Sequence, residues 1–136
     1  MKYLILDDME YKRDRIKEYV SSIDTEATFE EFSCTRDFMS FLRDFVRNKD
    51  KMKDYLLFLD WNFPFYAHEH IEVAEGEHIL VTLELRHFEM KVIIVSSEEV
   101  EYDTEYPYVL GTIKDDCSVW QKPEYEKYLE MVKEEM

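Results

Sequence analysis

Side chains that can bind metal ions and phosphoryl groups directly follow short apolar segments in this sequence of 136 residues. The segments and the residues after them are Lys2–Leu6 before Asp7 and Asp8, Tyr55–Leu59 before Asp60, Val92–Val95 before Ser96, and Ser118–Gln121 before Lys122. Such apolar runs are typical of buried parallel strands, and open α/β sheets gather their chemistry beyond the carboxyl ends of the strands. Carboxylates, a hydroxyl and an ammonium at one edge suit a divalent cation and a phosphoryl group.

Each of these residues taken alone also has an ordinary structural interpretation. The Asp7-Asp8 pair can stabilise the N-terminus of a following helix, where negative charge is favoured. Asp60 can be a loop aspartate, Ser96 a helix N-cap, and Lys122 a surface lysine before proline. The position of every one of them at the end of a separate apolar segment is what favours a shared site.

The segments between the expected strands have helical spacing of apolar residues. Met9–Ser22 is predicted to be a helix with Met9, Arg13, Ile16, Tyr19 or Val20, and Ile23 on one stripe. A second helix is expected to begin with Thr35 as its N-cap, and a third to turn Ile79, Leu80 and Leu83 inward. The last helix is expected to have Pro123 in its first turn and a buried stripe of Tyr125, Tyr128, Leu129 and Val132.

The alternation of strands and helices predicts an α/β fold with a doubly wound, five-stranded parallel sheet, a flavodoxin-like three-layer sandwich formed by a single domain over residues 1–136. Ala27–Ser33 is a weak strand, and Arg47–Asp54 is expected to be a solvated turn. Val100–Cys117 has the least regular pattern. Within it, Tyr108–Ile113 could be a strand of its own, and Lys114 would then take the place assigned to Lys122.

The composition limits the classes of partner. A net charge of −15 argues against nucleic acid, because that binding depends on basic residues that neutralise phosphates. The two cysteines have no metal or disulfide spacing and suggest free thiols in the cytoplasm. No segment approaches the ~18 apolar residues of a membrane span, so no membrane association is expected.

Five motifs, in this order, resemble the response-regulator receiver domains (CheY-like) of two-component signalling. They are Leu4–Arg13 with its acidic pair, Phe58–Pro64 around an acceptor aspartate, Glu75–Arg86 as a third helix, Val92–Ser97 as a strand ending in a hydroxyl residue, and Lys122-Pro123. The resemblance covers nearly the whole chain. It implies a stand-alone phosphoacceptor that is not an enzyme in its own right, beyond self-catalysed phosphoryl transfer and dephosphorylation.

The resemblance also implies a role for each site residue. Asp60 would accept the phosphoryl group from a histidine kinase or a phosphotransfer protein. Mg²⁺, or Mn²⁺, would be bound by Asp8 directly, by Asp7 mainly through water, and by Asp60 and the backbone carbonyl of Asn62.

The readout of phosphorylation would begin at the two remaining site residues. Ser96 would move toward the aspartyl phosphate, and Lys122 would hold a phosphoryl oxygen. The signal would then pass to a downstream protein partner.

Three features depart from the family pattern. The loop Phe65–Val73 is longer than usual, and Val100–Cys117 carries proline and glycine where the family has a fourth helix. Val119 stands where the family usually has an aromatic residue.

Two other functions therefore stay open. One is a pseudo-receiver, a binding module of the same fold that is regulated without phosphorylation. The other is a small haloacid-dehalogenase-like phosphatase, a family that uses Asp-x-Asp, whereas Asp60-Trp61-Asn62 lacks the second acid.

Overall fold

The computed structural model describes the chain except residues 46, 68–73, 103–104, 116–120 and 135–136. The elements in chain order are β1 (Lys2–Leu6), α1 (Glu10–Ile23), β2 (Thr28–Phe32), α2 (Thr35–Arg43), the 3₁₀ helix η1 (Lys49–Asp54), β3 (Tyr55–Leu59), α3 (Glu75–Leu85), β4 (Lys91–Ser96), β5 (Val109–Lys114) and α4 (Lys122–Glu134). The predicted alternation of strands and helices is confirmed, apart from the corrections given below.

The strands form one sheet of five parallel strands in the order β2-β1-β3-β4-β5. From β1 the chain moves outward to β2, and then returns to place β3 on the other side of β1. The two central strands therefore lead into connections on opposite sides of the sheet, which leaves a crevice beyond their carboxyl ends. Asp7, Asp8 and Asp60 follow these two strands.

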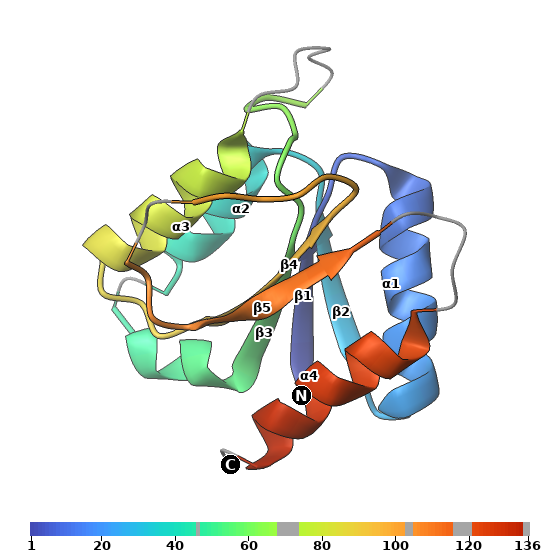
Figure 1. Ribbon diagram of the computed structural model, residues 1–136. Helices are drawn as coiled ribbons and strands as arrows, with labels where there is room; N and C mark the ends of the chain where they lie inside the picture. Colours follow the sequence, from blue (N-terminus) through green and yellow to red (C-terminus); the bar gives the residue numbers. More distant parts are fainter. Residues whose placement is uncertain (46, 68–73, 103–104, 116–120, 135–136) are drawn as a thin grey trace.

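Helices cover both faces of the sheet, as Figure 1 shows, with α1 and α4 on one face and α2 and α3 on the other. Side chains alternate along each central strand. In β1, Tyr3 and Ile5 pack toward α1 and α4, whereas Leu4 and Leu6 pack toward α2 and α3. A strand that is buried on both faces needs an unbroken apolar run, which is why these segments stand out in the sequence.

The fifth strand is not Ser118–Gln121, the preferred prediction, but the alternative, Tyr108–Ile113, shifted by one residue at each end. Val109–Lys114 pairs with β4, with Ser96 opposite Lys114, and Gln121 lies outside any strand. Ser118, Val119 and Trp120 lie outside the described residues. The prediction chose the segment next to Lys122-Pro123. Pairing with β4 decides which segment becomes the fifth strand, and Val109–Lys114 forms that pairing.

Three smaller predictions were also wrong. Cys34 occupies the N-cap of α2, and Thr35 is its first helical residue. The segment predicted to be a solvated turn contains η1, in which Met52 is completely buried among the side chains below α2 and α3. Met9, which was predicted on the apolar stripe of the first helix, is exposed at the N-cap of α1. Ile16 and Val20 are the residues that α1 buries.

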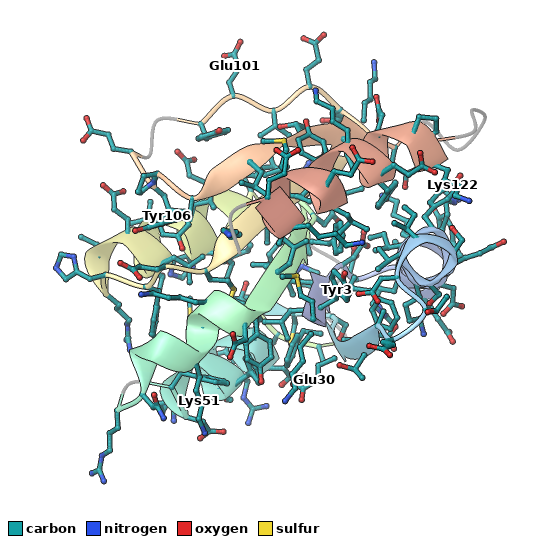
Figure 2. All side chains as sticks on the ribbon, turned by 90° about the horizontal axis from the view of Figure 1, so that it is seen from below. Tyr3, Glu30, Lys51, Glu101, Tyr106 and Lys122 are labelled. Carbon is teal, nitrogen blue, oxygen red and sulfur yellow. The ribbon has the colours of Figure 1, made fainter. Side chains whose placement is uncertain are left out.

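The connection from β4 to β5 contains no helix within residues 97–102 and 105–108, the part of it that is described. It lies beside α3 in Figure 1, and Tyr106, which is labelled in Figure 2, is buried at this place. The Tyr106 hydroxyl donates a hydrogen bond of 2.5 Å to the Met90 carbonyl. Val100 and Tyr108 pack against the same core. Aromatic side chains thus take over the packing role of a helix.

Among the residues that are described, no helix has the length and apolar character required to cross a membrane.

Candidate functional site

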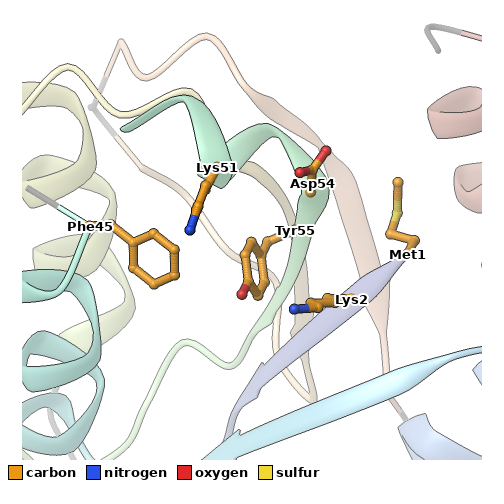
Figure 3. Close-up of a pocket in the computed structure, with 6 residues that line it drawn as sticks. All are labelled: Met1, Lys2, Phe45, Lys51, Asp54 and Tyr55. Carbon is orange, nitrogen blue, oxygen red and sulfur yellow. The ribbon is translucent and has the colours of Figure 1, made fainter. Parts of the chain in front are cut away.

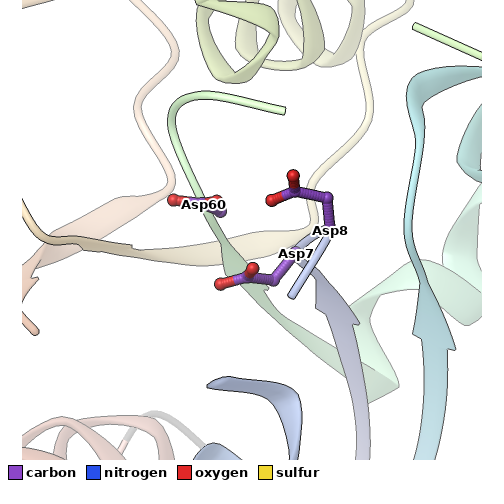
Figure 4. A group of neighbouring side chains, drawn as sticks. All are labelled: Asp7, Asp8 and Asp60. Carbon is purple, nitrogen blue, oxygen red and sulfur yellow. The ribbon is translucent and has the colours of Figure 1, made fainter. Parts of the chain in front are cut away.

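Three carboxylates meet at the carboxyl ends of the two central strands. Asp7, Asp8 and Asp60 each offer an oxygen, and these oxygens lie within 4.8 Å of one another. Figure 4 shows the three side chains converging from β1 and β3. Asp7 and Asp8 are adjacent in sequence but can both take part, since the backbone is already leaving the strand at this point.

Backbone hydrogen bonds hold these residues in place. The N–H of Asp7 donates to the Phe32 carbonyl, and the N–H of Asp60 donates to the Leu6 carbonyl, so both continue the ladders of the sheet. One Asp7 carboxylate oxygen accepts the Met9 N–H at 2.9 Å, and one Asp60 oxygen accepts the Trp61 N–H at 2.8 Å. The other Asp7 oxygen, Oδ2, is buried and has no partner in the described part of the chain.

Burial makes the ionised form of these acids costly. It raises the pKa of Asp60 to about 8, with a further increase from the negative charge of Asp7. Burial also raises the pKa of Asp7 to about 6, although the hydrogen bond from the Met9 N–H acts in the opposite direction. A cation between the carboxylates would relieve both effects.

The donor set fits a hard divalent cation. Three carboxylates are enough for Mg²⁺, which keeps several of its waters. The unpartnered Asp7 Oδ2 is a buried acceptor that such an ion, or one of its waters, would satisfy. Asn62 lines the pocket beside Asp8 and Asp60, where its predicted role as a carbonyl ligand can be tested.

The carboxylates open into a polar pocket of about 190 Å³. Its described lining is Asp8, Met9, Tyr11, Lys12, Asp60, Asn62, Ser96, Ser97 and Glu98. Ser96 is buried at the end of β4, and its hydroxyl accepts the Glu98 N–H at 3.2 Å. The structure therefore brings the predicted serine and the three predicted aspartates to one place.

Neither of the candidate lysines is among the described residues that line this pocket. Lys114 is exposed at the end of β5, and Lys122 begins α4, as Figure 2 shows. The sequence had predicted that Lys122 follows a strand. Gln121, the residue before it, lies outside any strand, and residues 118–120 lie outside the described residues. The role of Lys122 in holding a phosphoryl group stays a prediction, as does the alternative role of Lys114.

Lys12 is a pocket residue that the sequence prediction missed. Burial lowers the pKa of its ammonium, but the charges of Asp60 and Asp7 outweigh this effect, so the pKa lies above its ordinary value. The spacing of Lys12, Ile16 and Val20 could have revealed it, because residues four apart share a helix face. Ile16 and Val20 are the buried residues of α1.

The loop after Asp60 is fixed by close packing against α3. The N–H of Gly76 donates to the Trp61 carbonyl at 3.0 Å. A Cβ atom at Gly76 would lie 2.7 Å from the Asp60 carbonyl oxygen and 2.6 Å from the Trp61 ring. The Trp61 ring in turn lies 6.0 Å from the ring of Tyr102, centroid to centroid. Trp61 therefore connects the carboxylate pocket to the β4–β5 connection.

A larger pocket of about 500 Å³ lies at the opposite ends of the strands. Figure 3 shows its lining of Met1, Lys2, Phe45, Lys51, Asp54 and Tyr55. The Lys2 ammonium lies 5.7 Å from the Tyr55 ring centroid. Its single described carboxylate belongs to the exposed Asp54, so it lacks the converging acids of the smaller pocket.

Comparison with known proteins gives structural matches only. No family model and no curated protein matches the sequence. The response regulator receiver domain (CheY-like) from Methylobacillus flagellatus is 15% identical with a TM-score of 0.66, covering 97% of this chain and 98% of that one. The fold is that of a receiver domain.

Two further receiver structures agree with this assignment. The response regulator receiver protein from Pseudoalteromonas atlantica is 16% identical, with a TM-score of 0.64 over 97% of this chain and 96% of that one. The receiver domain protein (CheY-like) from Methanospirillum hungatei JF-1 is 18% identical, with a TM-score of 0.60 over 98% and 94%. The sequence-based resemblance to receiver domains is confirmed in the fold. At these identities the likeness shows the fold alone.

Proposed function

We propose that this chain is a phosphoacceptor receiver, in which Asp60 takes a phosphoryl group from a histidine kinase or a phosphotransfer protein in the cytoplasm. The observation that carries the proposal is the convergence of Asp7, Asp8 and Asp60 within 4.8 Å beside a pocket that also contains Ser96. A structural acidic pair would need no third carboxylate and no adjoining pocket.

The reaction needs little covalent help from the protein. A carboxylate oxygen of Asp60 attacks phosphorus, the bond from phosphorus to the donor histidine nitrogen breaks, and its electron pair returns to the imidazole. Phosphoryl transfer passes through a loose transition state, so positioning and charge stabilisation supply most of the catalysis. The hydrogen bond from the Trp61 N–H orients the acceptor carboxylate, and burial keeps bulk water from competing with it.

Asp7, Asp8, Asp60 and the Asn62 carbonyl would hold Mg²⁺ or Mn²⁺ at this site. When bound, the ion supplies positive charge that balances the carboxylates and the phosphoryl oxygens. Asp7 Oδ2 is the buried acceptor that would face the ion or its waters. Ser96 would donate a hydrogen bond from its hydroxyl to a phosphoryl oxygen, because in its present contact with the Glu98 N–H the hydroxyl oxygen is only an acceptor.

The signal produced by the proposed reaction is a change of surface. The transfer also regenerates the donor histidine, and the later hydrolysis releases inorganic phosphate. The chain would act on no substrate beyond its own aspartyl phosphate, which it forms and later hydrolyses. A downstream protein would recognise the altered surface beside Ser96, formed by the connection from β4 to β5.

Intact mass spectrometry after incubation with acetyl phosphate and Mg²⁺ tests the proposal. We expect one added phosphoryl group, dependent on Mg²⁺ and absent in Asp60→Asn. Asp54→Asn is the matched control, since Asp54 is an exposed aspartate outside the site. An adduct that survives Asp60→Asn would contradict the assignment of the acceptor.

A pseudo-receiver is the second candidate, favoured by the absence of Lys114 and Lys122 from the described pocket lining. In that case the same pocket would bind its ligand without covalent chemistry. An absence of adduct with acetyl phosphate and with phosphorylated phosphotransfer proteins would favour this second function.

A further inference from the structure

The basic side chain in the described lining of the carboxylate pocket comes from α1, and it was not predicted from the sequence as a site residue. We propose that Lys12, in the first turn of α1, binds the phosphoryl oxygen that the sequence-based assignment gave to Lys122. This inference rests on the proposed function, because it names the residue that stabilises the transferred group.

The geometry of the pocket carries the proposal. Lys12 lines the same pocket as Asp8, Asp60 and Ser96, and it is the basic residue in the described lining. Asp8, Asp60 and Glu98 are acids of that lining, and Asp7 lies behind them. A phosphoryl group that arrives among these charges needs a protein cation, and Lys12 already lines the pocket.

The other basic side chains on this part of α1 have acidic or carbonyl partners. Arg13 donates to the Asp7 carbonyl at 2.7 Å and pairs with Glu31. Arg15 pairs with the buried Asp115 at 2.5 Å, just after β5. Lys12 forms no ion pair with any residue in the described part of the chain. Lys12 is half-buried as a residue, and its ammonium is therefore available to a ligand.

The two alternative lysines are placed less favourably. In β5, Ile113 points toward α1 and α4, and the next residue, Lys114, points the other way and is exposed. Its neighbour Asp115 turns inward, but toward Arg15. Lys122 begins α4 on the α1 side of the sheet. Lys12 alone among these three lines the described pocket.

The test compares the rates of Mg²⁺-dependent adduct formation from acetyl phosphate in single variants. We expect Lys12→Met to lower the rate roughly tenfold or more, as the loss of a group that stabilises transition-state charge does. Lys12→Arg should recover most of the rate, since it keeps the charge. Lys17→Met is the matched control, because Lys17 lies on the same helix but pairs with Asp14 and Glu31. Lys114→Met and Lys122→Met should stay near the parent.

A second measurement shows that the Lys12→Met pocket is intact. Mg²⁺ titration followed by Trp61 fluorescence should show about three- to tenfold tighter binding in Lys12→Met, because a nearby positive charge is removed. Lys17→Met should bind Mg²⁺ as the parent does. An unchanged Mg²⁺ affinity in Lys12→Met would place its ammonium outside the pocket and overturn the inference.

The possible failures can be told apart. If the parent forms no adduct with acetyl phosphate or with phosphorylated phosphotransfer proteins, the proposed function fails and the phosphoryl-binding role of Lys12 fails with it. If the parent forms the adduct and Lys12→Met does so at the same rate, only the inference fails. Loss of the adduct in Lys122→Met or Lys114→Met, with Lys12→Met unaffected, would return the role to that lysine.

Discussion

Asp60 is 5% exposed and Asp7 is 1% exposed, so two acids share a site that solvates their charges poorly. Their pKa values, about 8 and about 6, both lie above those of the unfolded chain. The folded protein therefore binds more protons than the unfolded chain between about pH 4 and pH 8. In this window, each rise in pH reduces the free energy of unfolding of the metal-free protein.

The first prediction concerns this pH dependence. Without divalent cations, thermal stability should fall from pH 5 to pH 8, and Asp60→Asn should remove much of the decrease. At pH 8 the variant should be more stable by on the order of a few kcal/mol, the difference should shrink as the pH falls, and below about pH 4 the variant should match the parent. Melting curves in chelator would measure this effect. If the stability of the parent does not change over this pH range, the pKa values of these acids are not raised in the folded protein.

The second prediction concerns Gly76, which lets α3 approach the backbone of Asp60 and Trp61 closely. In Gly76→Ala the new methyl group would meet backbone atoms of Asp60 and Trp61, which cannot move aside as a flexible side chain can. We expect a loss of about 1–3 kcal/mol, although alanine favours helix formation by ~1 kcal/mol. Urea unfolding would measure it, with Val81→Ala on the exposed face of α3 as the control. A stabilised Gly76→Ala protein would contradict the packing.

At the scale of elements, the end of α3 carries a local strain. His87 has a φ of 58° and is the one described residue, glycines included, with a positive φ. The N–H groups of His87 and Phe88 donate back to the Glu84 and Leu83 carbonyls, as in a left-handed helix terminus. Glycine is the usual residue at such a position because it has no Cβ.

The third prediction follows from this helix terminus. His87→Gly should stabilise the protein by about 0.5–1 kcal/mol, because the conformation is then free of steric cost. Arg86→Gly is the matched control, since Arg86 has a φ of −92° and gains nothing from glycine. Denaturant unfolding of both variants would check the difference. If the two variants are equally destabilised, the left-handed conformation does not limit stability.

The connection between β4 and β5 is the other element with a distinct character. It is held by Tyr106, Tyr108 and Val100 instead of a helix in its described residues. It contacts the loop after Asp60 through Trp61 and Tyr102, and it leaves β4 at Ser96. Two routes therefore lead from the site to this surface, one through an aromatic contact and one through the backbone.

At the scale of the whole molecule, a structural change that begins at Asp60 can reach another surface only through side chains or segments that can adopt two positions. A phosphoryl group adds roughly −1.5 to −2 charge. It would draw the Ser96 hydroxyl inward and disturb the position of Trp61. The far end of the sheet, where β1 and β3 begin, lies behind fully buried apolar residues such as Leu4 and Leu57, and the described residues offer no such route to it.

The fourth prediction is that amide hydrogen exchange will change locally on phosphorylation. We expect altered exchange in residues 97–102 and 105–108, and unchanged exchange in β1 and β2. Tyr102→Leu should reduce the change if the aromatic contact transmits it, while leaving the phosphoryl adduct itself intact. Mass spectrometry of peptides from the phosphorylated protein and from Asp60→Asn would test this. An adduct with no change in these residues would keep the proposed chemistry and discard the proposed readout.

The sequence by itself determined the four strands β1 to β4, the helical stripes and the convergence of Asp7, Asp8, Asp60 and Ser96. These follow from local patterns, because a strand that is buried on both faces must be apolar and its end must turn polar. Only the tertiary structure decided which segment pairs with β4, since Val109–Lys114 and Ser118–Gln121 are both plausible strands until pairing selects one. It also decided that Lys12, rather than Lys114 or Lys122, faces the acids. The direction of a long side chain depends on how its helix is rotated against the sheet, and this rotation is set by Ile16 and Val20 packing into a core built from distant parts of the chain.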